Sequence, residues 1–537
     1  MGRQRSRQSP AADHTQFFGS QVGGKSVINY SYTDMPLRLL LWDVTYFFTF
    51  AWALPWVVWP VRPCDGGHFD ELSFTPENLW CVLIHLVLAV FQLAFIVLLP
   101  VAFILPVWLF IAGLIVFFSV NSLLCRCLNG STITYTSDPK YAPALDEHQH
   151  EQWIFLNGVA VGEAWLKNNI NRLALTFKRP VIGVHNRTTG IIFDVVECLI
   201  QRNFGYATSD IRQAYKIIKG KLYNPQYSKV VFILHSQGGI EGGMVLDWLL
   251  QELPQDLLAK LEVYTFGSAA NHFNNPHRHA GSQEAEEQHP DTRIKIPATI
   301  TSVPITDSPV EMKTPMLKRQ PSNGNSSSFK TNGEPQTLTS MSSGQVTSPE
   351  TAFTVPASDR AIGHVEHYAH TTDFVALWGV LHFVSNERAS PEMPRFIGRV
   401  FSRTSPRGGH QLCQHYLDGM FPLARDADGE FVGCVDSNDF MESVVEVAGK
   451  GTEKDVIREG FENSWSMIER GGRQGSGVKT EVAVHGSFHG NKEDIDDGKV
   501  RVKDLSRLWL YRNGQSPPEV PRGLTRDEDG IVRGATM

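Results

Sequence analysis

The chain has 537 residues, of which 42% are hydrophobic and 20% are charged, and this composition excludes a disordered acidic tail and a collagen-like repeat. Its 49 lysines and arginines stand against 56 aspartates and glutamates, so the net charge of −7 argues against a basic nucleic-acid-binding surface. Seven scattered cysteines are too few for a disulfide scaffold.

A membrane region is predicted at 36–128, after a polar N-terminal segment at 1–35. No Asp, Glu, Lys or Arg occurs from Asn78 to Cys125, a run of 48 residues. One helix of that length would be about 72 Å long, against about 30 Å of bilayer hydrocarbon. Two helices therefore fit the run better than one.

Prolines divide this charge-free run into a hairpin. Helices are expected at about 82–99 and 106–124, with the break around Pro100 and Pro106, because proline lacks the N–H that a helix needs. An earlier apolar stretch at 39–59 is rich in tryptophan, which is typical of membrane interfaces. It predicts either a third span or a helix lying in the interface.

An α/β domain is predicted at 148–425. Short apolar runs alternate with helix-like stretches, and each run ends in small or polar residues that suit the rim of a ligand site. This alternation predicts a mostly parallel sheet with helices on both faces. The runs are 153–156, 181–184, 230–234 and 261–266.

Two further segments have the composition of peripheral or disordered chain. Residues 277–360 contain nine prolines, two phenylalanines and no tryptophan or tyrosine, so we expect a disordered insertion within the domain. Residues 426–537 are charged and glycine-rich, and we expect a peripheral, partly disordered C-terminal tail.

The most informative local feature is the sequence Val230-Val-Phe-Ile-Leu-His-Ser-Gln-Gly-Gly239. A buried strand runs directly into Ser236, and two glycines open a helix. This is the arrangement of a nucleophile elbow, in which a tight turn exposes a serine hydroxyl above the sheet. The turn also directs backbone N–H groups, beginning with that of Gln237, at a developing oxyanion.

A nucleophilic serine needs a base and an acid that orients the base, and in such a sheet the chain order is serine, acid, histidine. Asp373 follows the insertion within an apolar run, and His410 lies in a Gly-Gly-His loop after the next strand. We therefore assign Asp373 as the acid and His410 as the base, with His415 as the alternative base. His235 should point away from the cleft and have a structural role.

The segments His235-Ser-Gln-Gly-Gly239 and Tyr264-Thr-Phe-Gly-Ser268 resemble the α/β-hydrolase superfamily, particularly the class 3 lipases. The chain is also similar to uncharacterised fungal membrane-bound hydrolase-like proteins. The resemblance implies an α/β-hydrolase-type sheet at 150–425 and a second oxyanion N–H from Val159 or Ala160. One position departs from the family, which has glycine two residues before the serine, where this chain has Leu234.

These observations lead to one expected function with two alternatives. We expect a membrane-anchored serine hydrolase, a lipase or esterase, that cleaves carboxylic esters through an acyl-enzyme, without cofactor or metal. The expected partners are a lipid or other ester and the bilayer, not nucleic acid, and the expected location is an endomembrane. The alternatives are an inactive hydrolase-like membrane scaffold and an acyltransferase with the same triad.

Overall fold

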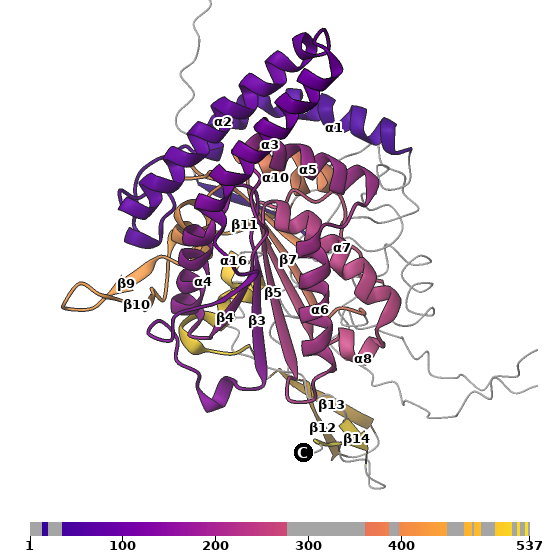
Figure 1. Cartoon of the computed structure of the whole chain (residues 1–537). Coiled ribbons are helices and arrows are strands. Elements are labelled where there is room, and N and C mark those ends of the chain that lie inside the picture. Colours follow the sequence, from indigo (N-terminus) through magenta and orange to yellow (C-terminus); the bar gives the residue numbers. More distant parts are fainter. Residues whose placement is uncertain are drawn as a thin grey trace, which may run out of the picture.

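The structure, a computed structural model, describes residues 13–19, 35–276, 360–385, 396, 398–447, 467–474, 477–484, 500–517, 524–526 and 532–534. The expected insertion at 277–360 lies outside these residues except for Arg360. At the centre is a nine-stranded mixed sheet with the strand order β11-β1-β8-β7-β6-β5-β3-β4-β2 (Figure 1).

The middle of this sheet is parallel, as the alternation of apolar runs and helices predicts. Every neighbouring pair among its six central strands runs in the same direction. These strands are β3 (Glu151–Leu156), β4 (Val181–Val184), β5 (Lys229–His235), β6 (Leu261–Phe266), β7 (His364–His370) and β8 (Arg399–Thr404). An antiparallel strand, β2 (Thr134–Thr136), forms the edge beside β4.

Helices cover both faces of the sheet, which explains why its central strands are buried along almost their whole length. Trp153 and Phe155 of β3 pack on one face with α4 (Glu163–Phe177), whereas Ile154 and Leu156 pack on the other. The second face is covered by α5 (Ile191–Phe204), α6 (Ser209–Tyr223) and α7 (Gln237–Glu252). The chain therefore forms an α/β domain with a mostly parallel sheet.

The polar N-terminal segment contributes a strand to this sheet. Strand β1 (His14–Phe18) pairs antiparallel with β8 and parallel with β11 (Val445–Val447). The side chain of Phe17 is completely buried, and its ring lies 5.2 Å from that of Phe401. Five residues in a polar context are too short for a recognisable pattern, and only the pairing with β8 shows their role.

The domain also continues beyond the predicted boundary at residue 425. Helices α16 (Val502–Leu505) and η7 (Leu508–Gly514) pack on the sheet, and Leu505, Trp509 and Tyr511 are buried. The other elements described from residue 423 onward are β9 (Leu423–Arg425), β10 (Phe431–Cys434), α13 (Asp439–Glu442), β12 (Met467–Gln474), β13 (Gly477–Val484), β14 (Leu524–Arg526) and β15 (Val532–Gly534).

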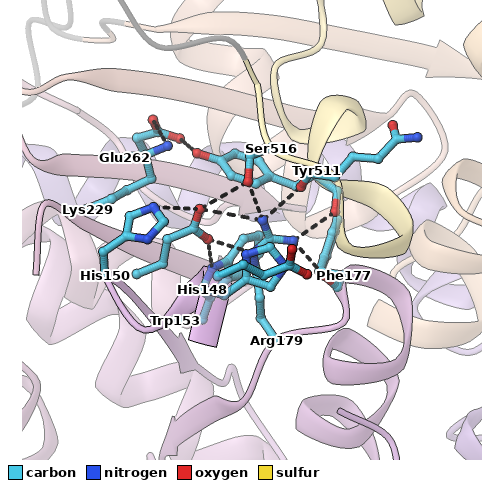
Figure 2. Close-up of polar contacts among 12 residues, drawn as sticks. His148, His150, Trp153, Phe177, Arg179, Lys229, Glu262, Tyr511 and Ser516 are labelled. Atoms are coloured by element: carbon cyan, nitrogen blue, oxygen red, sulfur yellow. Dashed lines mark hydrogen bonds and ion pairs between the residues drawn. The ribbon is translucent and has the colours of Figure 1, made fainter. Parts of the chain in front are cut away.

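A buried ionic cluster holds the segment 500–517 to the sheet (Figure 2). Arg179 Nε lies 2.6 Å from Glu151 Oε2, and the same guanidinium donates to Gln515 O at 2.8 Å and to Ser516 Oγ at 2.7 Å. Burial would raise the pKa of Glu151, but Arg179 and the Trp153 N–H hold it below its usual range. The carboxylate therefore stays ionised and paired at neutral pH.

Three apolar helices near the N-terminus are long enough to cross a membrane, by length and composition. They are Pro36–Val57, which joins α1 (Pro36–Phe50) to η2 (Ala51–Val57), α2 (Pro76–Ala102) and α3 (Val107–Asn129). Thr75 caps α2 by accepting from Asn78 N–H, and Pro76 occupies the first turn, where no N–H is needed. Helix α2 continues two residues past Pro100, so the break lies nearer Pro106 than predicted.

We predict that Arg179→Met lowers the free energy of unfolding by about 3–5 kcal/mol, because it leaves the Glu151 carboxylate buried without its cation. Segment 500–517 should then become protease-sensitive at lower temperatures than in the parent chain. Thermal unfolding and limited proteolysis of detergent-solubilised protein measure both effects. The control is Lys140→Met, which removes an ion pair with 63% and 46% exposed side chains and should cost at most about 1 kcal/mol.

Candidate active site

Ser236 stands in a sharp turn between β5 and α7. Its backbone has φ 58° and ψ −121°, a conformation that non-glycine residues rarely adopt. The residue is 2% exposed, and its N–H donates to Phe266 O at 3.0 Å, while Gly239 N–H donates to Ser236 O. This is the strand–turn–helix geometry that the sequence predicts around Ser236.

Two glycines allow the backbone to pass close to the serine. A Cβ at Gly158 would lie 2.3 Å from Ser236 Cβ, and a Cβ at Gly238 would lie 2.6 Å from Leu156 O. Real Cβ atoms do not approach other atoms this closely, so only glycine fits at either position. The turn therefore depends on small residues from two separate segments of the chain.

Leu234, which stands two residues before Ser236, packs against a glycine of helix α7. Its side chain is completely buried and points at Gly242, where an added Cβ would lie 2.3 Å from Leu234 Cδ1. Gly242, the sixth residue of α7, thus leaves space for the Leu234 side chain.

The structure brings Ser236, His410 and Asp373 together. His410 Nε2 lies 2.9 Å from Ser236 Oγ, and His410 Nδ1 lies 2.9 Å from Asp373 Oδ2. Asp373 begins α10 (Phe374–Trp378) and its Oδ1 accepts from Val375 N–H at 2.8 Å. His410 lies in the loop between β8 and the π-helix η6 (Leu412–Leu417). Three segments far apart in sequence therefore form one connected hydrogen-bond chain.

Asp373 is completely buried but remains ionised. Burial by itself would raise the pKa of this carboxyl, whereas His410, the Tyr416 hydroxyl and the Val375 N–H together hold it below its usual range. Tyr416 donates to Asp373 Oδ2 at 2.7 Å. A Cβ at Gly267, which has φ 53°, would lie 2.6 Å from the same oxygen. An ionised Asp373 fixes the proton of His410 on Nδ1, which leaves Nε2 free to accept from Ser236.

His235 packs against His410 and does not point away from it, but its contacts are structural, as expected. The His235 and His410 rings stack with centroids 4.8 Å apart, and His235 Nε2 lies 2.8 Å from His410 O. Burial and the neighbouring His410 lower the pKa of His235 to about 3. A neutral His235 can therefore donate its Nε2–H to the His410 carbonyl and hold the backbone of the base in place.

His415, the alternative base, is not near the serine hydroxyl. Its Nδ1 accepts from Gln411 N–H at 2.9 Å, which leaves Nε2 to donate to Pro60 O at 2.8 Å. Both ring nitrogens are thus engaged by the backbone, and burial lowers the pKa of His415 to about 4. The assignment of His415 as base is wrong because its ring joins η6 to the connection between α1 and α2.

Of the three backbone N–H groups expected to bind the oxyanion, those of Gln237 and Val159 fit the geometry and that of Ala160 does not. Gln237 is the first residue of α7, so its N–H is one of the helix donors without a helical acceptor. Ala160 N–H donates to Asp194 Oδ2 at 3.0 Å and is therefore not available, which corrects that assignment. Val159, which is half-buried in the same loop, is the remaining candidate for the second donor.

A buried polar network beneath the turn was not predicted from the sequence. The Gln237 side chain donates to Gln201 Oε1 at 3.0 Å and Glu197 Oε1 at 3.2 Å, and its Oε1 accepts from Asn186 Nδ2 at 2.9 Å. Asn186 also donates to Glu241 Oε1 at 2.8 Å. Polar residues spaced along α5 were the available signal, because Gln201 and Glu197 lie four residues apart on one helical face.

Comparisons with protein-family models, with curated proteins and with solved structures find no match to this chain. Among the residues that the structure describes, no group of three or more His, Cys, Asp or Glu side chains could hold a metal ion.

We predict that Gly242→Ala destabilises the protein by about 1–3 kcal/mol, because the new methyl group overlaps Leu234. Leu234→Ala alone should cost about 2–5 kcal/mol through a cavity, and the double variant should cost less than the sum of the two. Urea unfolding of the four proteins in detergent measures the coupling. The control is Gly220→Ala, at an open helical position with nothing within 4 Å, which should be neutral or stabilising. If the unfolding free-energy changes of the two single variants add up in the double variant, the packing of Leu234 against Gly242 is disproved.

We also predict a pH-dependent gain in stability for Glu197→Gln. Burial, with the nearby Asp210 and Asp194 charges, raises the pKa of Glu197 from 4.5 to about 7. The folded state therefore favours the protonated form, and the native chain loses stability as pH rises from about 4.5 to above 7. The variant should be more stable by about 1–2 kcal/mol at pH 8 and unchanged near pH 4.5. Exposed Glu430→Gln should show no such difference.

Proposed function

We propose that this chain is a serine hydrolase that cleaves carboxylic esters of lipids through an acyl-enzyme. The single observation that carries the proposal is the connected chain Ser236 Oγ–His410–Asp373, with both hydrogen bonds at 2.9 Å and the serine in a strained strand-to-helix turn. Such strain persists where the surrounding structure enforces it, and it is typical of functional sites.

The geometry supports a two-step reaction in which protons and leaving groups balance. Ser236 Oγ attacks the ester carbonyl carbon while His410 Nε2 takes the hydroxyl proton, and Asp373 stabilises the resulting imidazolium. The carbonyl oxygen becomes an oxyanion beside the Gln237 N–H. The carbon–oxygen bond to the alcohol then breaks, and the alcohol leaves with the proton from His410. Water, deprotonated by His410, hydrolyses the acyl-enzyme and releases the acid.

The neighbourhood of the site favours a lipid ester as substrate. Gln411, next to the proposed base, donates its Nε2–H to Val57 O at 2.7 Å, and Val57 ends the first apolar helix. Helix α10, which begins at the proposed acid, lies against α1 (Figure 1). The proposed nucleophile is thus beside the helices that suit a membrane, where lipid esters are concentrated. The substrate rests on this placement, since a fold alone does not fix a substrate.

A hydrolase-like scaffold without activity is the second candidate, and the burial of Ser236 is the observation that favours it. A serine that is 2% exposed needs a movement of the covering segments before an ester carbonyl can reach it. An acyltransferase with the same three residues is a third candidate that the geometry does not distinguish from a hydrolase.

We predict that a fluorophosphonate probe labels the detergent-solubilised chain at Ser236. Ser236→Ala should abolish the labelling, and Asp373→Asn should slow it by about 10⁴-fold because the His410 tautomer is no longer fixed. Ser268→Ala is the matched control, because this buried serine follows the neighbouring strand β6 but its hydroxyl contacts Ala270 N–H, and it should leave labelling intact. Equal melting temperatures verify that the variants fold.

Absence of labelling in the correctly folded parent chain would contradict the proposal and favour the scaffold. Products decide between the two enzymatic candidates. A hydrolase releases free acid from a lipid ester in the presence of glycerol or sterol, whereas an acyltransferase forms a new ester with one of these alcohols.

A further inference from the structure

Helix α5 buries its polar side chains and exposes its apolar ones, which is the reverse of a helix facing water. Its charged and amide side chains point into the protein, where Asp194, Gln201 and Arg202 are buried. Its outward side chains are apolar, and Ile191, Val196, Ile200 and Phe204 are 38–48% exposed. A water-exposed helix carries the opposite pattern, so the outer face of α5 fits an apolar surrounding.

The three apolar helices show the same reversal and adjoin α5. In α1, Asp43 is buried, with its Oδ1 2.9 Å from an Arg202 nitrogen, whereas Leu37 and Phe48 on the outside are 70% and 71% exposed. In α2, Gln92 is buried and Val90 is 62% exposed. Helices α1, α2, α3 and α5 gather at one end of the molecule (Figure 1), so their apolar surfaces form one face.

Polar contacts tie the α2–α3 hairpin to the loop before α5. Gln92 Nε2 and Asn121 Nδ2 both donate to Thr189 O, at 2.7 and 3.1 Å, in the loop that leads into α5. The hairpin is therefore anchored at the level of α5. From Gln92 to Phe103 the chain advances 11 residues, or about 17 Å of helix, against about 30 Å for the hydrocarbon of a full bilayer.

The turn of the hairpin suits hydrocarbon better than water. No polar residue occurs between Leu93 and Phe118, and at the tip Phe103 and Ile104 are 71% and 83% exposed. A turn that emerged into water on the far side would expose these side chains at great cost.

Two backbone donors of the same turn are satisfied within the hairpin, as hydrocarbon requires of backbone polar groups. The Ile104 N–H donates to Val101 O and the Leu105 N–H donates to Ala102 O, both at 3.1 Å, and Pro106 has no N–H. The donors of the tight turn are thus paired within the hairpin.

We propose that the protein inserts into one leaflet of a phospholipid membrane and does not cross it. The α2–α3 hairpin enters the leaflet to a depth of about half the hydrocarbon thickness of a full bilayer. Helices α5 and α1 lie along the interface with their apolar faces toward the hydrocarbon. The partner is then a phospholipid monolayer, whether it is half of a bilayer or the coat of an apolar lipid phase. This inference does not depend on the proposed catalytic activity.

Thiol labelling of the hairpin tip in sealed phosphatidylcholine liposomes tests this arrangement. The full chain carries Ile104→Cys, with the partly exposed and exposed native thiols removed by Cys64→Ser and Cys127→Ser. A membrane-impermeant maleimide, added outside or trapped inside, should label Ile104→Cys only after detergent is added. Val432→Cys, at a 46% exposed position on strand β10, is the matched control and should be labelled in intact liposomes. Labelling of Ile104→Cys in intact liposomes from either side would overturn the proposal.

Binding to triolein droplets coated with a phosphatidylcholine monolayer provides an independent test. The parent chain should float with the droplets, because one leaflet is all that the hairpin requires. Phe204→Asp on α5 should reduce the bound fraction about tenfold, whereas Tyr223→Asp, at a 51% exposed position ending α6, should not. A chain that enters bilayers but fails to bind the coated droplets would show that it needs both leaflets and would disprove the inference.

Discussion

The close approach of helix α7 to the sheet is the constraint on which the rest of the site depends. Ser236 holds a left-handed backbone conformation because the chain must turn from β5 into α7 within one residue. Gly158 and Gly238 permit that approach, since a Cβ at either would overlap backbone or Ser236 itself. Once α7 is in this position, the Gln237 N–H and the serine hydroxyl lie at the carboxyl end of the sheet, where the His410 loop can reach them.

Helix α5 connects this turn to the end of the molecule where the three apolar helices lie. Its inner side supplies Gln201 and Glu197 to the side chain of Gln237, next to the serine, and Asp194 to the Ala160 N–H. The same helix supplies Arg202 to Asp43 of α1. The polar side chains of α5 are thus all used inside the protein, which leaves only apolar ones outside. One helix therefore both supports the proposed site and presents an apolar outer face.

Much of the α/β domain could be predicted because its signals are local. The runs that became β3, β4, β5 and β6 are apolar and end in small or polar residues, and the turn at Ser236 follows directly from β5. Asp373 and His410 were found from chain order and loop context. Strand β1 was not recognised, because its burial comes from pairing with β8, of which five residues give no sign. The amphipathic pattern at 502–511 was visible, but its packing on the sheet depends on contacts with distant residues such as Arg179.

The sequence by itself determined the alternation of strands and helices, the serine turn and the presence of a long charge-free hairpin, because each depends on neighbouring residues. Only the tertiary structure decided the contacts between distant segments. Hydrogen bonds join His415 to Pro60 and Ala160 to Asp194. Leu234 packs against Gly242. Gln92 and Asn121 both donate to the Thr189 carbonyl. The physical reason is that a hydrogen bond or close packing depends on distance in space, and residues far apart in sequence have no shared periodicity to reveal it.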